Sequence, residues 1–551
     1  MTTIPYKTPL RYLLLALLTA PALASCSLDE EPRDQIPEEE AFKTVDNLYM
    51  NTVATLYNYI GGATDGEGLQ GTCRGVYDLQ TFGSDEAMLP TRGIDWLDGE
   101  LWQDMYRHSW NPGLELAKNA WVYLYKVIAL CNHSLEQLDA HSDMLTDEQY
   151  QEYTAEVRAL RAIYYWYLLD IFGRVPLITS SDVALDKVKQ TDRSDLMRFV
   201  YSELMETRGS LPDGHSAHKG DSYGRVTRSV ANFVLAKLTL NAEVYADDDW
   251  TDGVRPDGSD IRFTIGSEEY NAWEATIQFC NDIEYDGFRL EELYSDNFIV
   301  GNERSNENIW VIAMDKDLFQ SQQQNILRSY HYRHAAAYGF SGENGSSATL
   351  STLVVFGYDT PQEDLRFEDC YWAGEVYDYN DQPILDRQGY PLTYYPWEVQ
   401  MDLSVSPYLE TAGARMKKYE IDRNSTKDGK LMDNDIVLFR YADVLLMRAE
   451  AYLRNGDVIS GQDDLNAVRG RSGMPERQLT MESIYDERLL ELCWEGWRRQ
   501  DMIRFGRYES LFEGDMYDAK VDERDGHTTV YPIPADVLAL NSYLIQNKGY
   551  R

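Results

Sequence analysis

Apolar residues recur at helical spacing in several long segments of the chain. Between residues 149 and 172 they stand at steps of three, four and seven, as Tyr150, Tyr153, Val157, Leu160, Tyr164, Leu168 and Ile171. This spacing places them on one face of an α-helix, so the segment is predicted to be a helix of about six turns. Gly173, followed by Pro176, is expected to end it.

Other segments follow the same rule and form apparent pairs. Helices are predicted over 119–138, 149–172, 228–246, 271–284, 435–455, 460–470 and 482–505. In 441–455, small Ala residues at close-contact positions precede Tyr452 and then Gly456-Asp457, which resembles a degenerate tetratricopeptide repeat. Because the spacing between pairs is irregular, the pattern favours helix pairs wrapped into one scaffold over a regular solenoid.

The stretches between the predicted helices have a different composition. Residues 60–115, 247–270 and 329–434 are rich in Gly, Asp, Asn, Pro and aromatic residues, without long periodicity. The last is too long to be a structureless loop in a compact domain, so short strands and ordered loops are expected there. Loops on a rigid scaffold commonly carry binding sites. The predicted fold class is therefore mainly α, with a ligand site on irregular loops and short strands.

The N-terminus has the features of an export signal. Lys7 and Arg11 precede an apolar run from Leu13 to Ala24, which is too short to span a bilayer as a helix. The run ends in Leu-Ala-Ser-Cys26, which resembles a bacterial lipobox, so residues 1–25 are predicted to be removed and Cys26 to carry a lipid anchor. An ordinary secretory signal with a chance cysteine is the alternative. The acidic segment 27–31 resembles a surface-export signal and also suits a solvated linker.

Composition narrows the possible partners. The 551 residues include 92 acidic and 51 basic side chains, giving a net charge of −41, which argues against a nucleic-acid partner. The five cysteines after Cys26 contain no CxxC pair, so no disulfide framework, zinc site or cofactor is predicted. The acidic loop 247–260 lacks the spacing of an EF-hand. With so many acids, close carboxylate pairs are inevitable and do not indicate a glycosidase.

Five blocks in order along the chain resemble the SusD/RagB family of outer-membrane nutrient-binding lipoproteins. The blocks are 156–178, 224–228, 440–473, 487–501 and 532–550. The third block runs from Arg-Tyr-Ala-Asp to Arg-Ser-Gly, and the fourth reads ER-x-x-EL followed by EG-x-R and Asp. The fifth block has Lys548 where the family usually has Pro. In the fourth block, the charged residues are expected to pair with one another and fix the fold. They are Arg488, Glu491, Glu495, Arg498 and Asp501.

The resemblance implies a function as well as a fold. It implies one SusD-like domain over 26–551, with an N-terminal part (27–230) and a C-terminal part (231–551), and tetratricopeptide-like helices as scaffold. The family binds oligosaccharides or polysaccharides at the cell surface, without catalysis. It delivers them to a SusC-like TonB-dependent transporter of the outer membrane. Capture of peptides or glycopeptides, and a glycan-active enzyme, are the alternatives.

Two loop regions contain the candidate ligand residues. In the first, Trp96 lies on a glycine-flanked turn that can present its ring to a sugar, with Asp98 or Arg92 bonding to hydroxyls. Trp102 and Trp110 have helical spacing and are expected in the core. In the second region, 329–400, the candidates are Tyr338, Trp372 and Tyr394. Each of these aromatics also suits ordinary loop packing.

Overall fold

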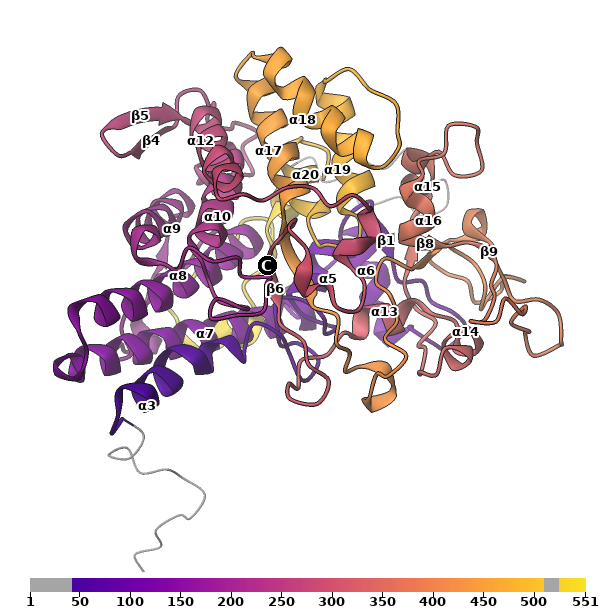
Figure 1. The fold of residues 1–551 in the computed structure, drawn as a ribbon, viewed down its shortest axis with the longest axis horizontal. Helices are drawn as coiled ribbons and strands as arrows, with labels where there is room; N and C mark the ends of the chain where they lie inside the picture. Colours follow the sequence, from indigo (N-terminus) through magenta and orange to yellow (C-terminus); the bar gives the residue numbers. More distant parts are fainter. Residues whose placement is uncertain (1–41, 510–524) are drawn as a thin grey trace, which may run out of the picture.

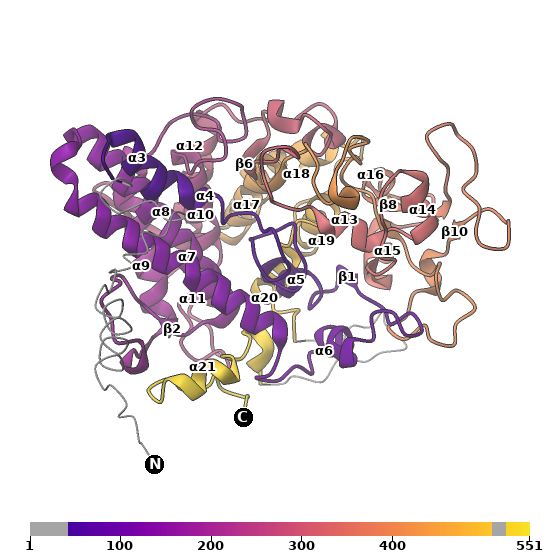
Figure 2. The ribbon, with the colours of Figure 1, turned by 90° about the horizontal axis from the view of Figure 1, so that it is seen from below.

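The computed structural model describes residues 42–509 and 525–551. The predicted signal peptide, Cys26 and the acidic segment after it lie outside these residues. Figure 1 shows long helices on one side of the molecule and a lobe of short helices, strands and loops on the other, and Figure 2 shows the same division from below. The predicted mainly helical fold with an irregular lobe is confirmed.

The long helices pack in chain order, each against the next. They are α7 (Glu115–Ala140), α8 (Asp147–Phe172), α9 (Arg193–Thr207), α10 (Arg228–Leu240), α12 (Ala272–Tyr285), α17 (Tyr441–Arg454) and α18 (Val458–Arg471). Thr146 begins α8 with a capping box, and Gly173 ends it in the left-handed region at φ 68°. The predicted helix pairs are therefore present, and a short separate helix, α11 (Ala242–Tyr245), completes the 228–246 segment.

The shorter helices occur near both ends of the described chain and in the lobe. They are α3 (Val45–Tyr49), the π-helix η2 (Met50–Ala54), α4 (Thr55–Tyr57), α5 (Val76–Thr81), α6 (Leu101–Arg107), α13 (Gln324–Ser329), α14 (Tyr332–Ala337), α15 (Leu350–Phe356), α16 (Arg366–Cys370) and α21 (Ala535–Leu540). No helix in the described part of the chain is long and apolar enough to cross a membrane.

The prediction of one helix over 435–455 was wrong at its start. Strand β12 (Ile436–Arg440) precedes α17 and pairs antiparallel with β6 (Asn308–Ile312). All five residues of β12 are buried. A strand that is buried on both faces has a continuous apolar run, and such a run cannot be distinguished from a buried helix by periodicity.

The prediction of one helix over 482–505 was also wrong. The segment contains two helices, α19 (Met481–Leu492) and α20 (Arg498–Arg504). Between them the backbone leaves the right-handed helical region, with φ at 65° for Trp494 and 75° for Gly496. A helix cannot continue through left-handed residues, so the chain turns here.

Six two-stranded antiparallel sheets occur within the described residues. Three of them build the lobe: β1 (Ala87–Met88) with β7 (Ser347–Ala348), β8 (Tyr371–Trp372) with β11 (Arg415–Met416), and β9 (Gly374–Glu375) with β10 (Thr393–Tyr394). The others are β2 (Val175–Pro176) with β3 (Gln190–Thr191), β4 (Arg262–Ile265) with β5 (Glu268–Asn271), and β6 with β12. The short strands predicted in 329–434 are confirmed.

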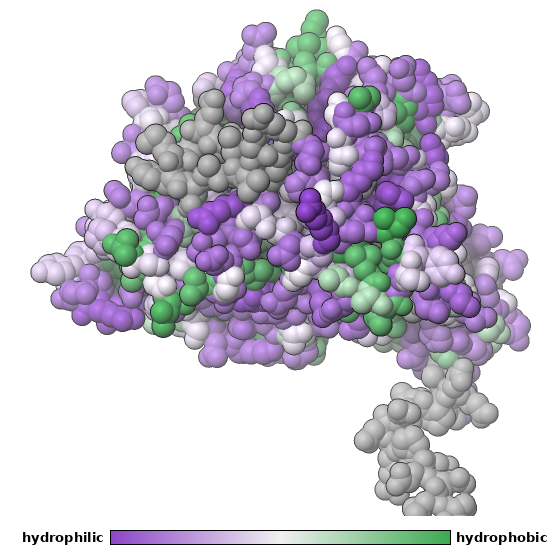
Figure 3. Space-filling view, turned by 180° about the vertical axis from the view of Figure 1, so that it is seen from behind, coloured by the Kyte–Doolittle hydropathy of each residue, from purple (hydrophilic) through white to green (hydrophobic). Residues whose placement is uncertain are grey.

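One hydrophobic core extends from Leu48 to Ile533 and crosses the predicted boundary at residues 230 and 231. A small second cluster of Val376, Ile384, Leu392 and Tyr394 lies inside the lobe. The face seen in Figure 3 is mostly hydrophilic, with small separate apolar patches. A single domain over 26–551 stays a prediction.

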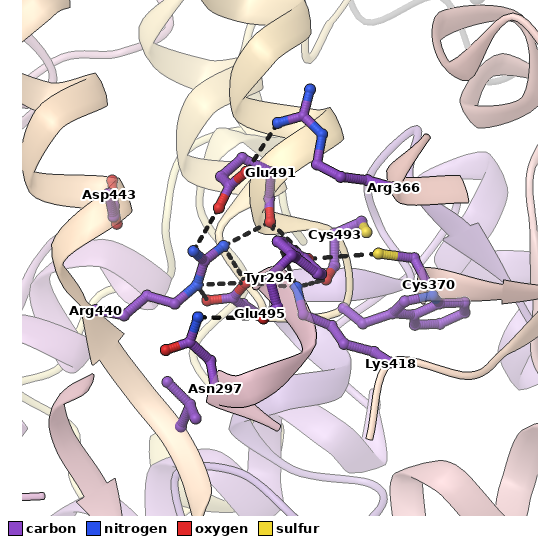
Figure 4. Close-up of polar contacts among 12 residues, drawn as sticks. Tyr294, Asn297, Arg366, Cys370, Lys418, Arg440, Asp443, Glu491, Cys493 and Glu495 are labelled. Carbon is purple, nitrogen blue, oxygen red and sulfur yellow. Dashed lines mark hydrogen bonds and ion pairs between the residues drawn. The ribbon is translucent and has the colours of Figure 1, made fainter. Parts of the chain in front are cut away.

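A buried network of ion pairs joins the lobe to the helices (Figure 4). Arg440 contacts Glu307, Glu491 and Glu495, and all four side chains are buried. The charged residues of the fourth block behave as expected. Arg488 pairs with Asp443 and Asp501, and Arg498 pairs with Asp85. These side chains therefore have a structural role, since their charges are neutralised inside the protein.

Glu86, just before β1, is a buried carboxyl without a paired cation. One of its oxygens accepts a hydrogen bond from the backbone N–H of Trp494, and the other has no hydrogen-bond partner. Burial raises the pKa of Glu86 to about 8. The unfolded chain loses this proton near pH ~4.3. Between these pH values the folded state holds a proton that the unfolded state lacks, so stability decreases as pH rises.

Glu86→Gln is therefore expected to change how stability depends on pH. The amide keeps an acceptor for Trp494 and does not ionise. The free energy of unfolding of the variant minus that of the wild type should increase by roughly 3 kcal/mol from pH 5 to pH 8, because only the wild type loses stability through this carboxyl. Urea unfolding at several pH values measures this difference, with the exposed Glu115→Gln as control. A constant difference across the range would contradict the expectation.

Candidate functional site

All six predicted ligand residues lie in the same lobe. The loop with Arg92, Trp96 and Asp98 packs on the segment 343–347, because Trp96 Nε1 donates to Glu343 O at 3.0 Å. Arg92 reaches the same segment through Gly345 O. The two regions predicted separately are therefore neighbours in space.

Helix α14 lies between two groups of these residues. On one side, Tyr332 Oη donates to Asp95 Oδ2 at 2.6 Å, which links the helix to the Trp96 loop. At its end, the ring of Tyr338 packs edge to face with that of Trp372, with centroids 6.2 Å apart. The lobe thus presents two aromatic surfaces, which we call the Trp96 surface (residues 93–98) and the Trp372 pocket.

The Trp372 pocket is an aromatic cavity of about 310 Å³. Its aromatic lining is Tyr330, Tyr338, Trp372, Tyr379 and Tyr419, and its charged lining is Asp369, Lys417, Lys418, Glu420 and Arg423. Trp372 Nε1 donates to Tyr330 Oη at 2.7 Å, which fixes the indole against the buried tyrosine. The pocket has the size of a small-ligand site, and its wall combines aromatic rings with an equal number of charged side chains.

Cations cover part of the aromatic wall. Lys417 Nζ lies 4.6 Å from the ring centre of Trp372, and the Arg423 guanidinium lies 3.6 Å from that of Tyr379. Tyr379 also stacks on Tyr338 at 4.3 Å. Burial raises the pKa of Tyr338 to about 12, so its hydroxyl is neutral at pH 7. The pocket therefore combines neutral tyrosine hydroxyls and aromatic rings with three cations and two carboxylates.

The Trp96 surface is more open. Trp96 is half-buried with φ at 60°, while Ile94 beside it is 90% exposed. A Cβ atom on Gly345 would lie 2.7 Å from the indole, so only glycine fits beneath the ring. Asp98 accepts from Arg74 Nη2 at 2.7 Å and from Trp102 Nε1 at 2.8 Å. Asp98 is therefore exposed but already paired.

Trp102 and Trp110 were predicted to lie in the hydrophobic core, and this prediction is confirmed. Trp102 is 1% exposed and packs edge to face on Phe82, with centroids 5.6 Å apart. Trp110 is 5% exposed, and its Nε1 donates to Tyr550 Oη. Both rings belong to the hydrophobic core.

Two predicted ligand residues do not reach the surface. Arg92 is 3% exposed, and its guanidinium donates to Gly345 O, Leu409 O, Ala412 O and Ser347 Oγ. Tyr394 is 1% exposed, and its hydroxyl accepts from His331 N at 3.0 Å. Burial lowers the pKa of Arg92 well below its usual value. Arg92 and Tyr394 were expected to contact a ligand directly, which does not agree with this burial. Their hydrogen bonds instead hold the loops around the two surfaces in place.

Arg92→Lys is expected to destabilise the protein without contacting a ligand. A single ammonium cannot reach four acceptors from two loop segments, so several buried carbonyl groups lose their donors. We expect a loss of about 3 kcal/mol in the free energy of unfolding, measured by urea denaturation. A variant with native stability and weakened ligand binding would instead place Arg92 in direct contact with ligand.

Several pocket residues had no recognisable signal in the sequence. Lys417 and Arg423 lie in a segment without aromatic clustering, more than 40 residues after Trp372. They reach the pocket because β11 pairs with β8, in the register Arg415 to Trp372 and Met416 to Tyr371. Pairing of two-residue strands cannot be predicted from their sequences, because such strands are too short for a periodic pattern.

Three other cavities among the described residues contain none of the six predicted residues. A groove of about 530 Å³ beside α7 and α21 is mainly apolar, with Trp121, Tyr125 and Leu540 in its walls. A polar pocket of about 430 Å³ lies between His331, Tyr395 and Glu410. Within residues 42–509 and 525–551, no group of three or more His, Cys, Asp or Glu side chains is placed to hold a metal ion.

Comparison with known proteins gives matches along most of the chain. The model of the SusD family matches residues 362–550, and a model described as starch-binding and associating with the outer membrane matches residues 75–240. The starch-binding protein SusD of Bacteroides thetaiotaomicron is 25% identical over 534 residues, covering 88% of this chain and 87% of that protein. A SusD-like protein of Bacteroides ovatus is 25% identical over 438 residues, covering 75% and 71%.

Solved structures have the same fold. A laminarin-binding SusD-like protein is 21% identical with a TM-score of 0.66, and the match covers 92% of this chain and 100% of that one. Surface glycan-binding protein A from Bacteroides thetaiotaomicron, solved with laminarihexaose, is 19% identical with a TM-score of 0.68, covering 92% and 99%.

Proposed function

We propose that this chain, as a member of the SusD/RagB family, captures an oligosaccharide or polysaccharide at the cell surface without acting as an enzyme. In this proposal the ligand is passed to a SusC-like TonB-dependent transporter of the outer membrane. The lipid at Cys26 holds the chain to that membrane.

The Trp372 pocket is the observation that carries the glycan proposal. Sugars present apolar C–H faces to aromatic rings and hydroxyls to polar side chains, so they need both in one cavity. Trp372 and Tyr338 supply rings, and Arg423 and Glu420 supply polar groups at the same pocket. The Trp96 surface, on the other side of α14, extends the site for a longer chain of sugars.

Isothermal titration calorimetry against a panel of glycans tests the proposal. The panel includes soluble starch, laminarin and acidic polysaccharides, and the protein is the mature chain from residue 27. Saturable heat with at least one glycan class is expected. Flat traces for every class, together with heat on addition of a peptide mixture, would favour peptide capture instead.

The lipid anchor has a separate test. Cys26→Ala removes the atom that would carry the lipid, so the chain should move from the outer-membrane fraction to the soluble fraction. Immunoblots of fractionated cells measure the distribution, and Cys73→Ala serves as the control cysteine change. Retention of Cys26→Ala in the membrane fraction would contradict lipid anchoring at this residue.

A further inference from the structure

Two of the five described cysteines are neighbours. Cys370 is the last residue of α16 and Cys493 directly follows α19, and both are fully buried. Their thiols are close enough to influence one another's pKa, and Figure 4 shows both side chains beside Tyr294. The other three cysteines lie in different elements, with Cys73 before α5, Cys131 in α7 and Cys280 in α12.

Backbone contacts hold the two cysteines in this arrangement. Cys370 O accepts from Lys417 N at 2.9 Å, and Cys493 O accepts from Lys418 Nζ at 2.7 Å. Cys370 Sγ donates to Tyr294 Oη at 3.4 Å, and Tyr294 Oη in turn donates to Glu491 O at 2.9 Å. Hydrogen bonds therefore hold the backbone carbonyl groups of both cysteines in place.

The two thiols differ in reactivity. Burial raises the pKa of both, and the pKa of Cys493 stays well above its usual value. For Cys370, the interaction with Cys493 and the nearby charge of Lys418 outweigh burial and lower the pKa overall. Since the thiolate is the nucleophile, Cys370 is the one that starts an exchange reaction.

We propose that Cys370 and Cys493 are joined by a disulfide bond in the exported protein. The proposal rests on the part of the proposed function that places the chain outside the cytoplasm, where disulfides form and persist. The cysteine spacing in the sequence predicted no disulfide framework. The two partners are over a hundred residues apart in the sequence, and only the fold brings them together.

The reaction is thiol–disulfide exchange with a protein oxidant that carries a reactive disulfide. The Cys370 thiolate attacks one sulfur of that disulfide, forms a mixed disulfide and releases the other oxidant thiolate. The Cys493 thiolate then attacks the Cys370 sulfur and displaces the oxidant. The two cysteines lose two protons and two electrons, and the oxidant takes up the electrons as a dithiol. Because both sulfur atoms are buried in the folded chain, exchange takes place late in folding, after Cys493 and Lys418 have come close to Cys370 and before the core closes.

The bond would anchor the candidate site to the scaffold. Cys370 immediately precedes β8, which carries Trp372, while Cys493 follows α19 in the buried ion network. The closed loop of roughly 120 residues contains β11, β12, α17 and α18, and a loop of this length loses much chain entropy on cross-linking. Reduction should therefore lower the melting temperature by a few degrees.

Differential alkylation of the full chain, purified from membranes of an exporting bacterium, tests the proposal. The protein is denatured without reductant, labelled with iodoacetamide, reduced, and labelled with a second alkylating reagent before mass spectrometry. Cys73, Cys131 and Cys280 should carry the first label, and Cys370 and Cys493 only the second. First label on all five residues would overturn the proposal.

Serine variants provide matched controls. Cys370→Ser should expose Cys493 to the first label, whereas Cys280→Ser should leave Cys370 and Cys493 protected. A reductant should lower the melting temperature of the wild type and of Cys280→Ser, and leave that of Cys370→Ser unchanged. If Cys370→Ser does not fold, the labelling of the wild type decides alone. Failure to bind any glycan would leave the labelling pattern unaffected, so the two proposals are tested independently.

Discussion

Arg440→Met is expected to remove most of the stability of the protein. Arg440 lies 2.8 Å from Glu307, 2.6 Å from Glu491 and 2.8 Å from Glu495, and none of these side chains is more than 1% exposed. Removing the guanidinium leaves three buried carboxylates with fewer cations. Breaking a buried ion pair from one side costs about 3–5 kcal/mol, and here three partners are affected. Typical domains have only ~5–15 kcal/mol in total.

The cost arises because the remaining charges cannot reach water. Burial alone would raise the pKa of Glu491, but Arg471, Arg440 and Arg366 together hold it well below its usual value. With Arg440 gone, the carboxylates must be desolvated without compensation or take up protons. We therefore expect a loss of at least about 4 kcal/mol in the free energy of unfolding at pH 7.

Urea unfolding followed by circular dichroism measures this loss. Arg198→Met is the matched control, because Arg198 pairs with Asp195 on the surface, where both side chains are more than half exposed. Such a pair contributes about 0–1 kcal/mol. Glu495→Gln is a milder change that tests the network if Arg440→Met does not fold. A loss below about 1 kcal/mol for Arg440→Met would show that the network does not stabilise the fold.

The double change of Trp96→Ala and Trp372→Ala is expected to abolish glycan binding. Trp96 and Trp372 are half-buried, so each ring offers part of its surface to a ligand. Truncation of an aromatic residue at the centre of a binding site costs about 2 kcal/mol or more, which is roughly 30-fold in affinity. Two independent losses of this size would place binding below detection by calorimetry.

The single variants and one control locate the site. Trp397→Ala changes a tryptophan of the same lobe that is 45% exposed and lies outside the Trp372 pocket, and it should alter affinity less than twofold. Gly345→Ala should weaken binding if the Trp96 ring is used, since the added methyl displaces the indole. Melting temperatures check that each variant is folded. Undiminished glycan binding by the double variant would place the site elsewhere.

Helical scaffold elements were predictable because each carries its own local signal. The 149–172 periodicity, with Gly173 as its end, corresponds to α8 within two residues at its start. Local signals failed where tertiary contacts decide the conformation. Residues 436–440 are a strand because β6 lies beside them, and the 482–505 segment breaks at Trp494 and Gly496.

The candidate site was predictable in part. Trp96, Tyr338 and Trp372 are aromatic residues in irregular loops, which is a signal that a sequence can display. The burial of a loop residue is not visible in a sequence. Arg92 and Tyr394 therefore seemed as accessible as the three aromatic residues, although both are buried. Lys417, Arg423 and Tyr379 were missed because only the β8–β11 pairing and the stacking on Tyr338 bring them to Trp372.

Residues that lie close together or occur in a fixed order in the sequence were enough to predict the helical scaffold and the resemblance to the SusD/RagB family. The folded structure was needed to see which side chains share a cavity, which charges are buried in pairs, and that Cys370 and Cys493 are neighbours. These features join residues that are far apart in the chain, and their contacts depend on how the whole core packs.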